Sequence, residues 1–196
     1  MKLVFASNNK HKLEEISQIA GSAISIVSLK DIGCTDEIPE TQPTIEGNAL
    51  QKARYVFDKF KVNCFADDTG LEIEALNGDP GVYSARFAGV GCSFDDNMNK
   101  TLLLMKGEIN RKAKFRTVIA LIIDGREYTF DGYVNGVILE EKHGDKGFGY
   151  DAIFMPEGYN RSFAEMSAEV KNSLSHRSMA ARNMLEYLKR NPQLIV

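Results

Sequence analysis

The sequence contains few cysteines, and those it has fit neither a disulfide framework nor a metal-binding pattern. Cys34, Cys64 and Cys92 are odd in number, and none of them belongs to a C-x-x-C motif. Scattered cysteines of this kind argue against a zinc site and are typical of proteins from a reducing compartment.

The sequence also lacks any long apolar stretch. The first apolar run extends only over residues 3–6, which is too short for a signal peptide. The roughly 18 consecutive apolar residues of a transmembrane helix are found nowhere in the chain. We therefore expect a soluble, cytoplasmic protein with no membrane partner.

Basic charge is not in excess either. With 24 Lys and Arg against 27 Asp and Glu, the formal net charge is −3. Proteins that bind duplex nucleic acid are usually basic, because phosphate neutralisation dominates their affinity, so we expect no nucleic-acid partner. The 196 residues, 43% hydrophobic and 26% charged, are typical of a globular chain with one domain or two closely joined lobes.

What the sequence does contain is an alternation of strand-like and helix-like segments, without repeats or low-complexity tracts. Apolar runs and alternating patterns predict strands at residues 3–6, 24–29, 63–66, 71–75, 115–123 and 128–139. Helical spacing of apolar residues predicts helices over 13–20 and 45–60, after Ser93 and after Ser175. Irregular loops are expected at 30–43, 78–91 and 144–154, and the polar residues 67–70 lie between two predicted strands. This order predicts an α/β fold with a mixed sheet, in which the turn Asp124-Gly125 closes a long hairpin.

The turn that leaves the first strand is rich in amides and ammonium groups: Ser7-Asn8-Asn9-Lys10-His11-Lys12. The start of the following helix offers unpaired backbone N–H groups, which attract anions. The segment therefore fits a polyphosphate, although it lacks the G-x-x-x-x-G-K-[ST] pattern of a P-loop. A solvated loop would have the same composition, and the residues alone leave both interpretations open.

Two adjacent carboxylates, Asp67 and Asp68, follow an apolar strand. Side by side they would repel each other unless a cation lies between them. Mg²⁺ needs only one or two carboxylates when substrate phosphates complete its shell, so this pair is a candidate metal site or general base. The alternative is that one of the two caps the following turn.

Two further segments carry recognition chemistry. Phe148-Gly149-Tyr150-Asp151 combines aromatic faces that stack on nucleobases with a carboxylate that accepts from a ring N–H, although a core strand start looks similar. Lys171, His176 and Arg177 gather donors near a predicted helix start, where the helix dipole disfavours cations. Either a bound anionic or carbonyl-rich group or a tolerant surface accounts for them.

Together these segments resemble the Ham1/inosine triphosphatase family, the nucleoside triphosphate pyrophosphatases that clear non-standard purine nucleotides. The resemblance runs in the family's order from residue 5 to residue 177 and covers nearly the whole chain. It is carried by FASNNKHKLEEI (5–16), PETQPTIEGNALQKA (39–53), FADDTGLEIEAL (65–76), GDPGVYSARFAG (78–89), DKGFGYDAIF (145–154) and SAEVKNSLSHR (167–177).

The resemblance implies an elongated α/β fold, with two lobes around a long mixed sheet and the nucleotide in the cleft between them. It also implies a homodimer, Mg²⁺ as cofactor and a purine nucleoside triphosphate as substrate. The expected reaction breaks the bond between the α- and β-phosphates of ITP, dITP or XTP and releases the monophosphate and pyrophosphate.

The resemblance also assigns roles to individual residues. The residues that would bind the phosphate chain are Ser7, Asn8, Asn9 and Lys12, with Lys10 and His11 beside them. Lys12 would also stabilise the departing pyrophosphate. Ser7 replaces a threonine of the family pattern, and Asn8 replaces a glycine, which asparagine can imitate because it tolerates left-handed conformations.

On the metal side, the resemblance assigns Mg²⁺ to Glu40 and Asp68, with Asp68 also the base for the attacking water. Asp67 would be either a further ligand or an orienting group. Gln42 stands where the family often has glycine. Thr69 would also contact the substrate. Phe148 would stack on the purine, with Gly149 and Tyr150 beside it, and Asp151 would accept from the ring N–H. Donors to the base carbonyls would be Lys171, His176 and Arg177.

Two other interpretations remain at this point. One is a relative of the same fold with a different base preference, such as a pyrimidine or a methylated nucleotide. The other is a nucleotide-binding protein without catalysis, against which the adjacent aspartates argue.

Overall fold

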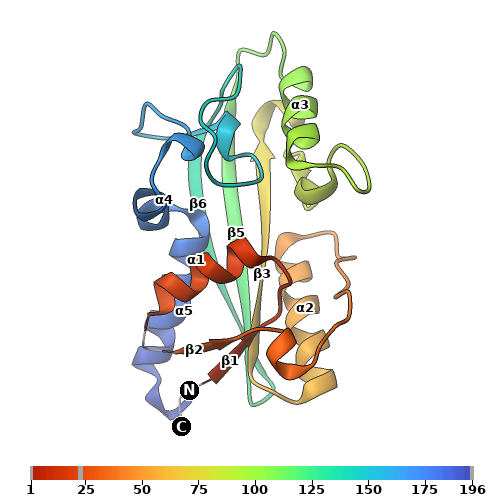
Figure 1. The fold of residues 1–196 in the computed structure, drawn as a ribbon, viewed down its shortest axis with the longest axis vertical. Coiled ribbons are helices and arrows are strands. Elements are labelled where there is room, and N and C mark those ends of the chain that lie inside the picture. Colours follow the sequence, from red (N-terminus) through yellow and green to blue (C-terminus); the bar gives the residue numbers. More distant parts are fainter. Residues whose placement is uncertain (1, 22–23, 195–196) are drawn as a thin grey trace. The chain divides into compact units, whose positions relative to one another are not determined.

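The computed structural model describes residues 2–21 and 24–194, which fold into two compact units. Unit 1 is drawn from the residues up to 68, from 117–132 and from 176 onward, and unit 2 from 69–116 and 133–175. Three long strands contribute residues to both units: β3 (Cys64–Ile73), β5 (Lys112–Ile123) and β6 (Arg126–Ile138) (Figure 1).

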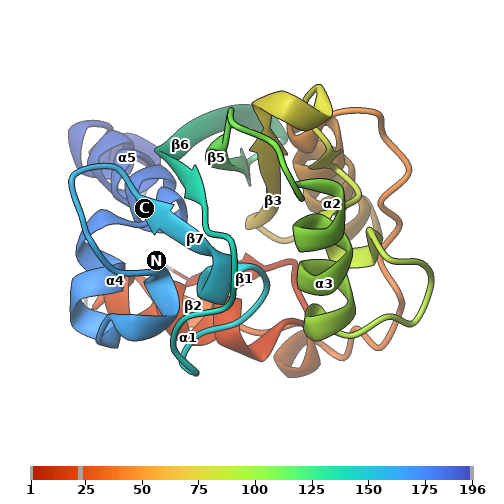
Figure 2. The same cartoon turned by 90° about the horizontal axis from the view of Figure 1, so that it is seen from above.

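The described strands form one mixed sheet, as the sequence predicts. Its order is β2-β1-β3-β5-β6-β7, with β4 paired to β3. The neighbouring strands β3, β5 and β6 can be followed in Figure 2. β1 is parallel to both β2 and β3, whereas β4 and β7 are antiparallel to their neighbours. The shorter strands are β1 (Lys2–Phe5), β2 (Ser25–Val27), β4 (Pro80–Gly81) and β7 (Phe154–Pro156).

The predicted hairpin is confirmed, and its turn explains its sequence. Asp124 and Gly125 join β5 to β6, and both have positive φ angles, 50° and 78°. Two-residue hairpin turns need such angles, which Asp-Gly adopts with little strain.

In unit 1, helices cover both faces of the sheet. α1 (Lys10–Ala20) and α5 (His176–Arg190) contact each other and share a core with one face, while α2 (Ile45–Phe60) lies on the other (Figure 1). Side chains along a strand alternate between faces. Phe65 of β3 therefore joins the α1–α5 core, whereas the thiol of the neighbouring Cys64 donates to the carbonyl of Ala53 in α2 at 3.2 Å.

Unit 2 has an aromatic core of its own. Phe115 of β5 packs edge-on against Phe154 of β7, with ring centroids 4.7 Å apart, and Phe163 packs against both. Its helices are α3 (Phe94–Leu104), which starts with a capping box between Ser93 and Asp96, and α4 (Ala168–Leu174). Short 3₁₀ turns lie at Lys30–Ile32, Glu74–Leu76, Ser84–Arg86, Asp151–Ile153, Phe163–Glu165 and Pro192–Leu194.

The sequence prediction was wrong in one place that matters for the site. Two separate strands were expected at 63–66 and 71–75, with the polar residues 67–70 between them, but β3 runs without interruption from Cys64 to Ile73. The expected turn is absent from this segment, so neither aspartate caps one. Among the described residues, no helix is long and apolar enough to span a membrane.

Candidate active site

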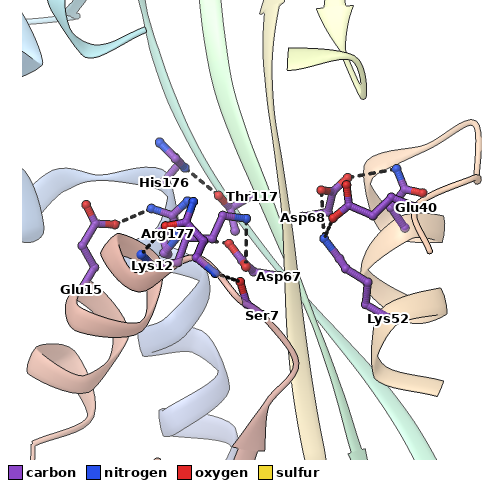
Figure 3. A network of polar contacts seen from close by, with 12 residues as sticks. Ser7, Lys12, Glu15, Glu40, Lys52, Asp67, Asp68, Thr117, His176 and Arg177 are labelled. Atoms are coloured by element: carbon purple, nitrogen blue, oxygen red, sulfur yellow. Dashed lines mark hydrogen bonds and ion pairs between the residues drawn. The ribbon is translucent and has the colours of Figure 1, made fainter. Parts of the chain in front are cut away.

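The two adjacent aspartates of β3 point to opposite faces of the sheet, because successive strand residues alternate. Asp67 lies two residues after Phe65, on the same face of the strand, and faces α1 and α5; Asp68 lies two residues after Ala66 and faces α2 (Figure 3). Each carboxylate meets its own cation there. Mutual repulsion is thereby relieved without one cation shared between the pair.

Asp67 is fully buried and holds two cations. Its Oδ1 accepts a hydrogen bond from Nζ of Lys12 at 3.1 Å, and its Oδ2 accepts from Nε of Arg177 at 3.1 Å (Figure 3). The same guanidinium is ion-paired with Glu15. Arg177 is only 2% exposed, so this is a buried network in which each charge needs its partner.

Burial and charge act in opposite directions on these groups. Burial alone would raise the pKa of Asp67, but Lys12 and Arg177 outweigh it and hold the pKa of that carboxyl well below its ordinary value. For Lys12, burial outweighs the attraction of Asp67 and lowers its pKa. Asp67 is therefore ionised at neutral pH, and its carboxylate fixes the position of the Lys12 ammonium group.

On the other face, Asp68 and Glu40 converge on a single ammonium group. Nζ of Lys52 lies 3.2 Å from Oδ1 of Asp68 and is also ion-paired with Oε1 of Glu40 (Figure 3). Nδ2 of Asn48 donates to the second oxygen of Asp68 at 3.3 Å. Burial, partly offset by Lys52, raises the pKa of Asp68, whereas the two carboxylates outweigh burial and raise the pKa of Lys52.

This arrangement fits a small divalent cation. The carboxylates of Glu40 and Asp68 already surround one positive charge, and Glu40 is partly open to solvent, with 35% of its side chain exposed. Among the described residues, no group of three or more His, Cys, Asp or Glu side chains is arranged to hold a metal by itself. Mg²⁺ does not need such a cage, because phosphate oxygens and water complete its shell. Asp67, the third candidate ligand, faces away from Glu40 and is engaged by Lys12 and Arg177.

The opening loop is shaped by its own side chains. Oδ1 of Asn9 accepts from the backbone N–H of Lys12 at 3.2 Å and so caps α1, and Oγ of Ser7 accepts from the N–H of Asn9 at 3.2 Å. The amide of Asn8 donates to the carbonyl of Asp36 at 3.5 Å. Ser7 and Asn9 thus order the turn that presents Lys12, while Lys10 and His11 are exposed on the first helical turn.

In unit 2, Phe148, Asp151 and Lys171 are brought together as a second cluster. Oδ2 of Asp151 accepts from the backbone N–H of Phe148 at 2.8 Å and from Nζ of Lys171 at 2.9 Å. Nζ of Lys171 also lies 4.6 Å from the centroid of the Phe148 ring, a cation–π contact. Gly147 permits this packing, because a Cβ there would lie 2.1 Å from Oδ2 of Asp151.

The neighbouring motif residues support this loop. Gly149 has a φ of 66°, which favours glycine. Tyr150 is buried, and its hydroxyl donates to the carbonyl of Ser84 at 2.8 Å. Thr69 follows Asp68 in β3 and is partly exposed.

The expected trio of base-reading donors is divided between the two units. Lys171 belongs to unit 2, whereas His176 and Arg177 begin α5 in unit 1. Nδ1 of His176 lies 2.6 Å from Oγ1 of Thr117 in β5 (Figure 3). Gly132 of β6 lets this helix start come close, because a Cβ there would lie 2.1 Å from the His176 carbonyl oxygen.

Sequence reasoning missed Lys52, Asn48 and Glu15, which lie in direct contact with the predicted residues. A signal for them exists in the helical spacing. Asn48 and Lys52 are four residues apart beside the buried stripe of α2, and Glu15 lies one turn after Lys12 in α1. Polar residues that flank a core stripe at this spacing share a face with it and point toward the sheet.

A groove of about 790 Å³ in unit 2 does not involve any predicted site residue. It is lined by parts of β3, β5, β6 and β7, and an ion pair between Glu72 and Lys114, 2.8 Å long, crosses its wall. The two clusters described above are therefore better candidates for the chemistry than this groove.

Comparison with known proteins places the chain in a family. The model of the Ham1 family matches residues 3–187. A dITP/XTP pyrophosphatase of Flavobacterium johnsoniae is 53% identical over 188 residues, which are 96% of this chain and 98% of the relative. A dITP/XTP pyrophosphatase of Porphyromonas gingivalis is 50% identical over 188 residues, 95% of this chain and 97% of the relative.

Solved structures give the same assignment. The Ham1 protein of Staphylococcus aureus superimposes with a TM-score of 0.89 at 34% identity, covering 97% of this chain and 100% of that one. A HAM1 protein from Coxiella burnetii superimposes with a TM-score of 0.90 at 33% identity, covering 97% and 99%. With its family match, its relatives and its fold in agreement, this chain belongs to the Ham1 family.

Proposed function

We propose that this chain is a Mg²⁺-dependent nucleoside triphosphate pyrophosphatase that hydrolyses dITP, ITP or XTP to the monophosphate and pyrophosphate. The names and high identity of its relatives support the reaction, and the pairing of Glu40 and Asp68 around one positive charge carries the proposal for this chain. The protein would remove non-canonical purine nucleotides from the cytoplasmic pool as a homodimer.

Glu40 and Asp68 are the proposed ligands of Mg²⁺, which, when bound, supplies positive charge against the phosphate oxygens. Asp68 would accept the proton of the water that attacks the α-phosphorus. Lys12, held by Asp67, would stabilise the charge that develops on the departing pyrophosphate. We propose that Asp67 orients Lys12 and Arg177 and is not a metal ligand.

Unit 2 would supply base recognition through Phe148, Asp151 and Lys171, and His176 and Arg177 remain proposed donors from unit 1. Hypoxanthine and xanthine carry an acceptor oxygen at C6, where adenine carries an amino donor. Donors such as Lys171 would therefore face adenine donor to donor. A buried polar group left without a hydrogen-bond partner makes binding less favourable by about 1–3 kcal/mol. Each mismatch could therefore favour hypoxanthine or xanthine over adenine roughly 10- to 100-fold.

A substrate panel tests the proposal. The purified protein is incubated with dITP, XTP, dGTP, dTTP and ATP, with Mg²⁺ or with EDTA, and phosphate and pyrophosphate are assayed separately. We expect pyrophosphate from dITP and XTP, far less from the others and none with EDTA. Preferred turnover of dTTP or dGTP would indicate a different base preference. Nucleotide binding without pyrophosphate release would indicate a non-catalytic protein and overturn the proposal.

The metal assignment has a separate test in Glu40→Gln. Loss of one charged ligand should raise the Mg²⁺ concentration for half-maximal pyrophosphate release by about tenfold or more. An unchanged Mg²⁺ dependence would remove Glu40 from the ligand set while leaving the reaction class standing.

A further inference from the structure

The first apolar residue of α3, Phe94, is not packed into the core of unit 2. Met98 and Leu102 pack against the unit 2 core, whereas Phe94, one turn before Met98, remains 45% exposed. Its ring meets Phe148 instead, with ring centroids 6.1 Å apart and ring planes inclined by 46°. A large aromatic side chain therefore stands half in solvent beside the residue proposed to stack on the base.

The start of α3, which carries Phe94, contacts the loop that leads to Phe148. The capping box of Ser93 and Asp96 sets the first turn of α3, with Ser93 N–H donating to Asp96 Oδ2 at 2.8 Å. The adjacent Asp95 is ion-paired with Lys142, at the start of the loop that leads to Phe148. These contacts hold Phe94 near Phe148 while leaving its own side chain half exposed.

The spacing of the two rings is close to what a planar ligand needs. An aromatic base stacked between two rings requires a centroid separation of about 7 Å, twice the ~3.5 Å van der Waals contact. The observed centroid separation of 6.1 Å is smaller than this slot requires, and the ring planes, inclined by 46°, are not parallel. Rotation of the half-exposed Phe94 side chain would open it, and such rotamer changes are fast and weakly opposed at the surface.

We propose that Phe94 and Phe148 form an aromatic clamp for the purine base of the substrate, with Phe94 as a determinant of base affinity. The inference rests on the proposed function, because it takes Phe148 as the base-stacking residue. Lys171 contacts the Phe148 ring and Asp151 holds Lys171, so that polar recognition of the base edge and stacking on its face come from one cluster.

The test compares Phe94→Ala, Phe94→Leu and Phe94→Tyr with wild type. Loss of one base-stacking ring should raise KM for dITP roughly 5- to 100-fold in Phe94→Ala, with kcat within about twofold. Phe94→Leu should behave similarly because it keeps apolar volume without a stacking face, and Phe94→Tyr should restore KM. Leu103→Ala, which removes a 71% exposed side chain from the same helix, is the matched control and should change nothing.

A ligand that lacks a nucleobase distinguishes the loss of base stacking from a general disturbance of the active site. Inorganic tripolyphosphate should inhibit Phe94→Ala and wild type with equal inhibition constants, whereas IMP should bind the variant more weakly by the same factor as KM rises. If KM for dITP in both Phe94→Ala and Phe94→Leu stays within about twofold of the wild-type KM, the clamp is overturned. If Phe94→Ala fails to fold, Phe94→Leu decides.

Failure of the proposed function would look different. In that case wild type itself would release no pyrophosphate from dITP, and equilibrium binding of dITP would become the readout. Weaker binding by Phe94→Leu, with binding recovered by Phe94→Tyr, would support the clamp in a non-catalytic protein. Equal binding by all variants would overturn it.

Discussion

Asp67 and Asp68 are consecutive residues of β3, yet their carboxylates are paired with different cations on opposite faces of the strand. Asp67 holds Lys12 and Arg177, and Asp68 shares Lys52 with Glu40. On one side of the strand a single carboxylate therefore holds two cations, and on the other side two carboxylates share a single cation.

Asp67→Asn should destabilise the protein strongly at neutral pH, because it leaves Lys12 and Arg177 buried without a shared anion. Breaking a buried pair of this kind typically lowers the free energy of unfolding by about 3–5 kcal/mol. Glu127→Gln, which removes a surface partner of Arg54, is the control and should have a much smaller effect.

The difference in the free energy of unfolding between Asp67→Asn and wild type should depend on pH. The pKa of Asp67 is held below its ordinary value, so its stabilising contribution is complete above the unfolded pKa near ~4 and is lost as pH falls through the folded pKa. Urea unfolding of both proteins at neutral pH and near pH ~3 should show the gap narrowing in acid. A gap that stays constant or widens in acid would contradict the ion-pair account.

Lys52→Met should bind divalent metal more tightly than wild type in the absence of nucleotide. The ammonium of Lys52 lies between Glu40 and Asp68, so a metal must compete with it. Removing that charge should lower the Kd for Mn²⁺, measured by electron paramagnetic resonance, by at least about tenfold. Lys59→Met, on the exposed end of the same helix, should leave the Kd unchanged. Weaker metal binding by Lys52→Met would exclude this position as the metal site.

Asp151→Asn should weaken recognition of the base more than it slows the chemistry. The change removes the charged partner of the buried Lys171 and disturbs the bond to the Phe148 backbone. Charged hydrogen bonds contribute about 1.5–3 kcal/mol, so KM for dITP should rise roughly 10- to 100-fold, with a smaller change in kcat. Asp145→Asn, in an exposed part of the same loop, serves as control. A drop in kcat at constant KM would place Asp151 in another role.

The thiols should differ sharply in reactivity. Cys64 is fully buried, and burial raises its pKa to about 12, so it carries almost no thiolate near neutral pH. Cys34 is also buried, whereas Cys92 is partly exposed. Ellman's reagent should therefore modify Cys92 in the native protein and the other two only after unfolding. Equal rates for Cys64 and Cys92 would contradict the packing of Cys64 against α2.

Short-range sequence patterns correctly predicted the bounds of α2, the start of α3 and the turn of the long hairpin. The stripe of α2 ends at the predicted residues, and Ser93 begins α3 with the capping box that such a residue favours. The Asp124-Gly125 turn likewise encodes its hairpin. The short α4 was not predicted, because seven residues give too little periodicity to recognise.

Partners distant in sequence decided the rest. The segment from Asp67 to Gly70 looks like a turn because its residues are polar, but it is part of a strand that lies between β1 and β5 in the sheet. Its carboxylates are satisfied there by Lys12, Lys52 and Arg177, which come from three helices distant in sequence. Glu40 lies in a loop with no local signal, and only the family resemblance indicated it. Lys52 escaped notice because a single lysine beside a helical stripe looks like an ordinary surface residue.

The most direct test of the account is pyrophosphate release from dITP by Asp68→Asn with saturating Mg²⁺. Asparagine keeps the size of the side chain but removes both the proposed metal ligand charge and the proposed base, so we expect a loss of at least about a thousandfold in kcat in a protein that circular dichroism shows to be folded. Asp68→Asn protein that is folded and releases pyrophosphate at the wild-type rate would contradict the central claim.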